Sequence, residues 1–519
     1  MKNHNEVDSQ PEATTEARRD FLKLAGMTAT AAAVTGCGHG DPYALPKPDV
    51  PGASAFAQGE EQWVASACGQ CEAGCGVRVR VVEGRAVKLT GNNNSVINAG
   101  GIGPRAQAGC QVLYDPDRVV GPMRRLVPKG EPATGDEAWE QVSWETALEE
   151  LGEYLLELRE DERGNELCVV TGQERGSTRD LLARFAESFG TRNFMDGRAK
   201  RQNPAAAANL LMQGIDEVPA YDWADAELVV SLGAEVLQAS CQKVHFARAS
   251  GSNRRRARLV HVGTARTTTA DLADEFLQIR TGTFGAFALG LAAVVVAKGL
   301  HDRTFLEQHC AGFEDWIDPG GIERPGLRTL LESYTPETVS ELCGIDAASI
   351  EALGSELGNA APGFAFPGAE SYQTTGGVHA AMAVHALNAV LGSIDRPGGV
   401  LTQRLAPLDP WDELEPDEYA EETLELAPIW DGLASSPLAA ALFGPNFDDL
   451  PEALEAGTVD TLLLHYTNPL WSRPDAARWQ AALAKLPMVI SFSPHWDETS
   501  LAVADWILPD NSFLERWKE

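Results

Sequence analysis

The chain has 519 residues and a formal net charge of −33, because 75 acidic side chains outnumber 42 basic ones. A composition of 44% apolar and 23% charged residues is that of a folded protein, and the length allows several domains with buried cores. The excess of negative charge argues against nucleic acid as a partner, since its phosphates would be repelled.

The N-terminal segment resembles an export signal. An arginine pair, Arg18 and Arg19, precedes a mildly apolar run that is shorter than the roughly 20 residues needed to span a membrane. The run closes on the sequence VTGC, which resembles a lipoprotein cleavage box ending at Cys37. We therefore expect residues 1–37 to direct export by the twin-arginine route. The protein would be periplasmic or lie on the outer face of the cytoplasmic membrane, anchored by lipid on Cys37, with residues 38–60 as a Pro-rich linker.

Three cysteines follow within eight residues. Cys68, Cys71 and Cys75 have the spacing C-x2-C-x3-C, which lets neighbouring thiolates surround one small inorganic centre. Structural zinc usually takes two separated pairs of ligands, whereas three close cysteines and one distant cysteine suit an iron–sulfur cluster. Disulfides remain an alternative in an exported protein. The pattern therefore favours an iron–sulfur centre over zinc or disulfide bonds.

The next stretches are VEGRAVKLTGN, NAGGIGPRAQ and YDPDRVVGPMRR, in this order. Together with the cysteines they resemble the iron–sulfur domain of the molybdopterin oxidoreductases, the dimethyl sulfoxide reductase superfamily. The resemblance implies a [4Fe–4S] cluster domain over residues 61–125. It also implies that Arg105 lies between the cluster and a pterin cofactor, where a cation would raise the cluster potential.

The fourth cluster ligand is the first departure from the family. Where the family has its fourth cysteine, this chain has Gly103, and the next thiol is Cys110, seven residues later. In one interpretation Cys110 is the fourth ligand. In the other it is a core residue, and the three remaining thiolates hold a centre such as [3Fe–4S]. We expect Cys110 to be the ligand.

From residue 126 onward, strand-like and helix-like runs alternate. Residues 145–160 have apolar side chains at helical spacing, and a second helix is expected over 177–190, with Ser177 as its N-cap and Gly190 at its end. The uncharged run 284–297 is short for a membrane span and predicts a buried helix. Strands are expected at 167–172, 226–233, 257–263, 460–469 and 488–493. This alternation predicts doubly wound α/β domains over residues 126–519, with ligands at the carboxyl ends of the strands.

The family resemblance continues through this region, in stretches such as ADAELVVSLGAE, HVGTARTTTADLADEF and GSIDRPGG. It implies that loops after the strands hold the pyrophosphates of two pterin-guanine dinucleotides. Glycines permit close approach of the backbone to such groups, and hydroxyl or guanidinium groups can donate hydrogen bonds to them. The expected cofactor-binding residues, besides Arg105, are Gly233, Arg266, Thr267, Thr268, Gly282, Gly376, Gly377 and Gly399.

Two further departures concern catalysis. The family usually offers Cys, selenocysteine, Ser or Asp to molybdenum; here the position falls near Arg201, and Cys, Ser and Asp are absent between Gly197 and Gln213. The family's C-terminal barrel domain would follow residue 519, and we expect it to be absent or on a separate chain. Molybdopterin guanine dinucleotide is therefore a candidate cofactor, while molybdenum itself is doubtful.

These features predict an oxidoreductase subunit that passes electrons through its cluster in a membrane-associated respiratory complex. The alternative is a molybdenum-free electron-transfer or structural subunit of a quinone oxidoreductase complex, similar to subunits of alternative complex III and polysulfide reductase-like enzymes. The resemblance implies a ferredoxin-like iron–sulfur subunit and an integral membrane quinone-binding subunit as partners. A zinc-stabilised binding lipoprotein would remain only if the resemblance were accidental.

Overall fold

The computed structural model describes residues 60–516, except 136, 173–175, 197–202, 239–241, 253–256, 404–408, 410 and 431–446. The predicted signal residues Arg18 and Arg19, the predicted lipidation site Cys37 and the ligand position near Arg201 lie outside the described residues. The chain forms two compact units: residues 1–61 with 82–85, and residues 62–81 with 86–519. The second unit contains all the helices of the described residues.

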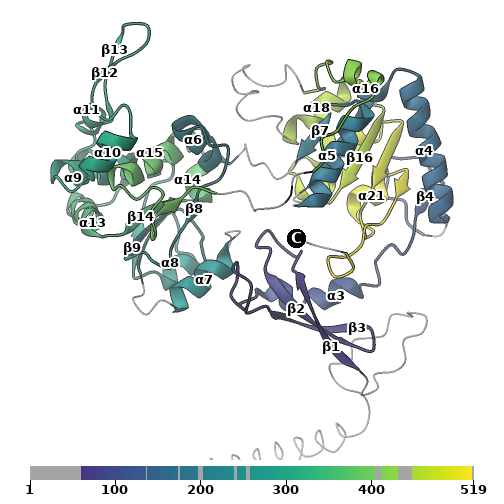
Figure 1. The fold of residues 1–519 in the computed structure, drawn as a ribbon, viewed down its shortest axis with the longest axis horizontal. Helices are drawn as coiled ribbons and strands as arrows, with labels where there is room; N and C mark the ends of the chain where they lie inside the picture. Colours follow the sequence, from purple (N-terminus) through teal and green to yellow (C-terminus); the bar gives the residue numbers. More distant parts are fainter. Residues whose placement is uncertain are drawn as a thin grey trace, which may run out of the picture. The chain divides into compact units, whose positions relative to one another are not determined.

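The cysteine-rich region forms a three-stranded sheet in the order β1-β2-β3 (Figure 1). The strands are β1 (Glu61–Ala67), β2 (Gly76–Val82) and β3 (Arg85–Gly91), and the three close cysteines lie in the loop between β1 and β2. Val77, Val79 and Leu89 are buried, following the period-two pattern of a half-buried strand. Helices α2 (Pro104–Gln107) and α3 (Gly109–Leu113) follow the sheet.

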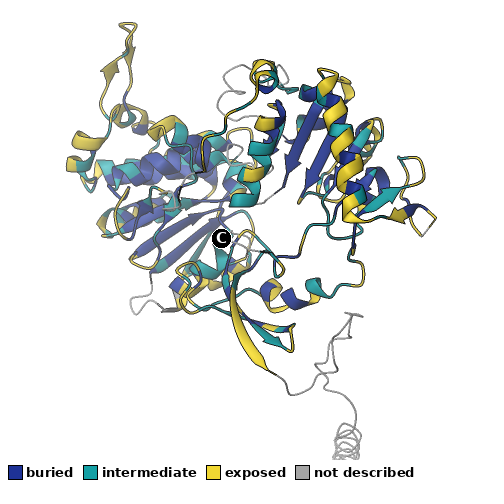
Figure 2. Cartoon of the chain, turned by 45° about the vertical axis from the view of Figure 1, so that its right-hand side comes forward, coloured by how far each residue is buried: buried dark blue, intermediate teal, exposed yellow. Residues whose placement is uncertain are grey.

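A seven-stranded sheet has the order β5-β4-β18-β17-β16-β6-β7. Its central strands β6 and β16 are buried along their whole length, which explains their continuous apolar sequences (Figure 2). Strand β4 pairs antiparallel with both of its neighbours, β5 and β18, and the other pairs are parallel. The strands are β4 (Met123–Arg125), β5 (Trp139–Gln141), β6 (Leu167–Thr171), β7 (Phe194–Asp196), β16 (Thr461–His465), β17 (Met488–Ser491) and β18 (Trp506–Ile507).

Helices pack on both faces of this sheet. On one face, apolar residues of α4 (Trp144–Glu160) and α5 (Ser177–Phe189) share a core with β6 and β17. On the other face the core is formed with α18 (Leu450–Glu455), α20 (Ala476–Leu483) and α21 (Glu498–Val503). This arrangement is the doubly wound architecture that the sequence predicts.

A four-stranded, fully parallel sheet has the order β11-β10-β9-β14. Alternate residues of β9 point to opposite cores: Leu228, Val230 and Leu232 to one, Val229 to the other. The first core is shared with α9 (Phe284–Ala297), α12 (Pro336–Cys343), α13 (Ala347–Asn359) and α15 (Gly377–Val390), and the second with α7 (Lys243–Ser252). The strands are β9 (Leu228–Leu232), β10 (Arg258–Gly263), β11 (Glu275–Gln278) and β14 (Gly363–Pro367).

The remaining elements are short and connect these layers. They are η1 (Gly164–Glu166), α6 (Pro204–Gln213), β8 (Ala220–Tyr221), α8 (Thr268–Leu272), α10 (Arg303–His309), β12 (Trp316–Ile317), β13 (Glu323–Arg324), α11 (Leu327–Leu331), α14 (Ala369–Tyr372), β15 (Val400–Leu401), α16 (Glu418–Thr423), η2 (Phe447–Asp449) and α19 (Pro469–Ser472).

The predicted α/β class, with a small N-terminal sheet domain before doubly wound domains, is confirmed. Helix α9 coincides with the uncharged run and is largely buried, and no helix in the described part of the chain is both long and apolar enough to cross a membrane. One detail is wrong: Ser177 is the first residue of α5, and the N-cap is Gly176. Gly176 has φ 75°, a conformation that glycine adopts at little cost, so the chain turns into the helix one residue earlier.

The seven-stranded and the four-stranded sheet each reverse their strand order at one point. In the larger sheet β6 and β16 are neighbours, and their successors β7 and β17 lie on opposite sides of the pair. In the smaller sheet the reversal falls between β9 and β14. In open α/β sheets ligands bind outside the carboxyl ends of the strands at such points. The fold therefore provides two candidate crevices, here called the β6–β16 crevice and the β9–β14 crevice.

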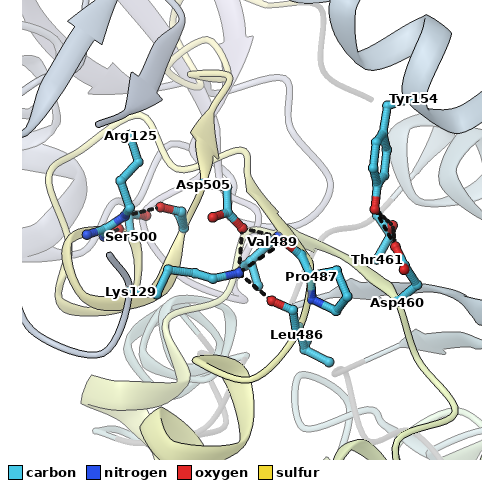
Figure 3. A network of polar contacts seen from close by, with 11 residues as sticks. Arg125, Lys129, Tyr154, Asp460, Thr461, Leu486, Pro487, Val489, Ser500 and Asp505 are labelled. Atoms are coloured by element: carbon cyan, nitrogen blue, oxygen red, sulfur yellow. Dashed lines mark hydrogen bonds and ion pairs between the residues drawn. The ribbon is translucent and has the colours of Figure 1, made fainter. Parts of the chain in front are cut away.

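A partly buried ion pair joins the segment after β4 to the residue before β18 (Figure 3). Lys129 Nζ lies 2.7 Å from Asp505 Oδ2 and also donates to the carbonyl oxygen of Leu486, while the same carboxylate oxygen accepts from Val489 N at 2.7 Å. The side chains of Lys129 and Asp505 are 12% and 24% exposed. The pair thus links the start of β17 to the residue before β18.

Replacing Lys129 by Met should lower the free energy of unfolding by about 1–3 kcal/mol, because the partly buried carboxylate of Asp505 loses its charged donor and the carbonyl oxygen of Leu486 loses a hydrogen bond. Lys298 is a matched control, since its ion pair with Glu351 is exposed and should be worth about 0–1 kcal/mol. Urea unfolding of the Lys129→Met and Lys298→Met proteins measures both. Equal unfolding midpoints for the two variants would contradict the prediction.

Candidate functional site

The loop with the three cysteines closes on itself. Cys68 N donates to the carbonyl oxygen of Cys75 at 2.8 Å, so the first and last thiol-bearing residues are neighbours. Gly74 has φ 57°, which provides the sharp turn before Cys75. Cys68 and Cys75 are buried and Cys71 is half-buried. We call residues 68–76 the thiol loop.

Cys68 and Cys71 act electrostatically on the thiol of Cys75. The pKa of Cys75 is raised to about 11 by burial, by the neighbouring Cys68 and then by Cys71, while the charge of Lys243 acts in the opposite direction. Three thiols on one closed loop suit a polynuclear iron–sulfur cluster, in which each thiolate binds its own iron. In the described part of the chain, no three His, Cys, Asp or Glu side chains converge as they would around a single metal ion.

The fourth-ligand residues are placed on two short helices. Cys110 is buried in α3, and burial is the cause that raises the pKa of its thiol to about 11, with no contribution from the other three thiols. Gly103 is the N-cap of α2, and a Cβ built there would find only Val244 Cγ2, at 3.9 Å, within 4 Å. The structure thus places Cys68, Cys71 and Cys75 on one loop, and Cys110 as the fourth ligand stays a prediction.

Two residues beside the thiol loop were not among the expected site residues. Asn98 is 1% exposed, and its side chain bonds Gly76 N at 2.8 Å and Gly76 O at 2.9 Å, directly after Cys75. Lys243, the first residue of α7, is the cation whose charge reaches Cys75, whereas Arg105 is exposed on α2. Asn98 could have been found, because it lies on the family pattern; nothing in the sequence marks Lys243.

The β9–β14 crevice is lined by closely packed backbone. Gly233 follows β9 with φ 65°, and a Cβ at Gly368, which follows β14, would lie 2.1 Å from Cα of Ala234. Only glycine permits this approach. Gly368 N also donates to the carbonyl oxygen of Leu232 at 3.0 Å, so the two loops stay paired beyond the strands.

A buried histidine lies beside this crevice. His261 Nδ1 is 3.0 Å from Ser231 Oγ, which itself donates to the carbonyl oxygen of Ala234. Nδ1 therefore carries the proton, and Nε2 lies 3.5 Å from Glu235 Oε1. Burial lowers the pKa of His261, while Glu235 and Glu370 oppose this shift. His261 Nε2 and Glu235 Oε2 are buried acceptors without a hydrogen-bond partner, and they fit a ligand that donates hydrogen bonds.

The β6–β16 crevice repeats this arrangement. Gly172 follows β6, and its N donates to the carbonyl oxygen of His465 at 2.8 Å, as Gly368 N does to that of Leu232. His465 Nδ1 lies 3.1 Å from Thr171 Oγ1, and Nε2 lies 3.5 Å from Asp510 Oδ2. Both histidines were missed, although each stands near the carboxyl end of an apolar strand, in VHVG and LHYT.

The predicted cofactor-binding residues are dispersed. Thr267 caps α8, which starts at Thr268, and its hydroxyl bonds Glu235; it therefore joins Gly233 at the β9–β14 crevice. Arg266 is exposed and paired with Asp271. Gly282 follows β11, and Gly376 is the N-cap of α15, whose first residue is Gly377.

Gly399 directly precedes β15, outside the four-stranded sheet. Its neighbour Gly398 packs against Pro362 and Asp225, which precede the amino ends of β14 and β9. The amino ends of these strands lie at the opposite end of the sheet from the β9–β14 crevice, which is at their carboxyl ends. The structure therefore does not bring Gly399 together with Gly233 and Thr267.

Comparison with known families matches the geometry. A family model described as molybdopterin oxidoreductase matches residues 118–518, and one described as molybdopterin oxidoreductase Fe4S4 domain matches residues 61–115. The chain is 30% identical to the menaquinone reductase molybdopterin-binding-like subunit of Nitratidesulfovibrio vulgaris, over 88% of this chain and 60% of that protein.

It is 25% identical to the thiosulfate reductase molybdopterin-containing subunit PhsA of Salmonella typhimurium, over 97% of this chain and 64% of that protein. Among solved structures, acetylene hydratase from Pelobacter acetylenicus matches with a TM-score of 0.68 at 21% identity, covering 87% of this chain and 63% of that one. The chain thus spans less than two thirds of the length of these proteins, and the structural match concerns the fold.

Cys75→Ser should abolish or strongly reduce bound iron and acid-labile sulfide, because a buried thiolate is replaced by a poor ligand. Cys310→Ser is the control, since Cys310 is half-buried and follows α10, away from the thiol loop in sequence. Colorimetric iron and sulfide assays on anaerobically purified protein make the measurement. Full iron content in the Cys75→Ser protein would contradict the assignment.

Cys110→Ala tests the fourth-ligand prediction separately. The predicted result is a loss of roughly one iron per chain and an altered electron paramagnetic resonance (EPR) spectrum, because one iron of the cluster would lose its thiolate. An unchanged iron content and spectrum would assign Cys110 to the core and leave a three-thiolate centre.

Proposed function

The chain belongs to the molybdopterin oxidoreductase family, and from that premise we propose that it is a redox subunit of a quinone-linked respiratory complex. Electrons pass through an iron–sulfur cluster held by the thiol loop. The observation that carries this proposal is the closed loop itself, which bears three thiols on a domain that matches the family's iron–sulfur domain. The similarity to a menaquinone reductase subunit supports the link to quinones.

The residues around the thiol loop suit electron transfer. Cys68 and Cys75 are buried, which excludes water from two of the ligands, and Asn98 fixes the backbone after Cys75. A rigid, dry environment lowers the reorganisation that accompanies each change of charge. When bound, the cluster would supply one-electron transfer, and the metal of the pterin cofactor would supply two-electron chemistry.

The two crevices are the proposed sites of the pterin-guanine dinucleotides. Their support is the glycine-permitted backbone approach and the unpartnered acceptors His261 Nε2 and Glu235 Oε2. The family is one of molybdopterin enzymes, so the expectation that molybdenum is doubtful finds no support in the comparisons. We therefore include a molybdenum-bearing pterin in the proposal, with the substrate left to experiment.

The proposed complex contains a ferredoxin-like iron–sulfur subunit and an integral membrane quinone-binding subunit. Its proposed place is the outer face of the cytoplasmic membrane, reached by the twin-arginine route, with lipid on Cys37. The support is the sequence of residues 1–37, which lie outside the described residues, and the similarity to a menaquinone reductase subunit.

Anaerobic purification followed by metal, sulfide and pterin analysis tests the proposal. We expect iron and sulfide in near-equal amounts, roughly three to four of each per chain, together with molybdenum or tungsten and a pterin. Reduction of the protein should produce a cluster signal in the EPR spectrum.

Zinc in place of iron, or thiols joined to one another as disulfides, would refute the proposed electron transfer. Iron and sulfide without pterin or molybdenum would select the alternative, a molybdenum-free electron-transfer subunit. One sample distinguishes the two outcomes, because each element is measured independently.

A further inference from the structure

Tyr466 has an unfavourable backbone conformation at the β6–β16 crevice. It is the first residue after β16, and its φ is 51°, in the left-handed region that side chains with a Cβ rarely adopt. The equivalent residue at the β9–β14 crevice is Gly233, with φ 65°. A tyrosine thus stands where the other sheet has a glycine. Strain of this kind is retained mainly where the side chain has a function.

The surrounding chain holds Tyr466 in this conformation. A Cβ at Gly172 would lie 1.8 Å from the carbonyl oxygen of Tyr466, so the two backbones are in direct contact. The hydrogen bond from Gly172 N to the carbonyl oxygen of His465 fixes the residue before it. The side chain of Tyr466 therefore leaves the crevice in a defined direction.

That direction leads to the thiol loop. Tyr466 Oη donates to the carbonyl oxygen of Gly69 at 2.8 Å. The same peptide unit carries the amide N–H of Gln70, which donates to Sγ of Cys68 at 3.5 Å. One peptide therefore links the tyrosine hydroxyl to the sulfur of a cluster ligand, and such consecutive hydrogen bonds polarise and strengthen one another.

We infer that Tyr466 is a positioning residue that tunes the redox potential of the cluster through the Gly69–Gln70 peptide. The inference rests on the proposed function, because it needs a cluster bound at Cys68. Hydrogen bonds to a thiolate stabilise the more negatively charged, reduced cluster and so raise its potential. The hydroxyl of Tyr466 orients the peptide so that its N–H faces the sulfur.

Tyr466→Phe removes the hydroxyl and keeps the ring. The expected result is a more negative midpoint potential in an EPR-monitored titration of the full protein, with iron and sulfide per chain unchanged. Deuterium electron-nuclear double resonance should also show a weaker coupling to the exchangeable amide proton near the cluster. Tyr154→Phe is the matched control, because the hydroxyl of Tyr154 on α4 bonds Asp460 instead of the thiol loop (Figure 3). Its potential should equal that of the wild type.

A second experiment tests the inference if the Tyr466→Phe protein does not fold. Wild-type protein with 3-fluorotyrosine at all tyrosines has a more acidic, stronger donor at Tyr466, and its cluster potential should rise. An unchanged potential in the Tyr466→Phe protein, or in the fluorinated protein if the variant cannot be made, overturns the inference. A wild-type protein without any cluster signal instead refutes the proposed function, and the inference with it.

Discussion

The hydrogen bond between Cys68 N and the carbonyl oxygen of Cys75 is the constraint on which the candidate site depends. It closes a loop of eight residues that carries all three thiols. The loop is then secured from distant parts of the chain, by the amide of Asn98 on one side and the hydroxyl of Tyr466 on the other. The proposed electron-transfer role rests on this geometry, because it keeps the three thiol-bearing residues on one short, closed loop.

The seven-stranded and the four-stranded sheet have similar backbone packing where their strand order reverses. At each reversal of strand order, a glycine after one strand (Gly172 or Gly368) packs against the backbone that follows the neighbouring strand. A buried histidine near the end of a strand then contacts a hydroxyl through Nδ1 and faces a carboxylate through Nε2, as His261 and His465 show. The repetition suits a cofactor made of two similar halves, because each half would meet the same set of groups.

Much of the fold could be predicted from the sequence, because its signals are local. The spacing of the cysteines marks the thiol loop, and the uncharged run 284–297 marks helix α9. Contacts between distant segments could not be predicted from such local signals. Lys243 and Tyr466 reach the thiol loop from positions more than 150 residues away in the chain, and no local pattern distinguishes them from other lysines and tyrosines. The sequence also does not show that Gly398 and Gly399 lie near the amino ends of β9 and β14, since a glycine pair looks alike at either end of a sheet.

Burial of Cys75 has a consequence for assembly. With a pKa of about 11, its sulfur carries a proton under physiological conditions, and a protonated sulfur is a poor nucleophile. We therefore expect the sulfur of Cys75 to react slowly with oxidants and with other disulfides. Binding of the proposed cluster would have to displace this proton, so alkaline conditions should favour it. Burial that would keep water from a bound cluster thus also protects this sulfur from oxidation.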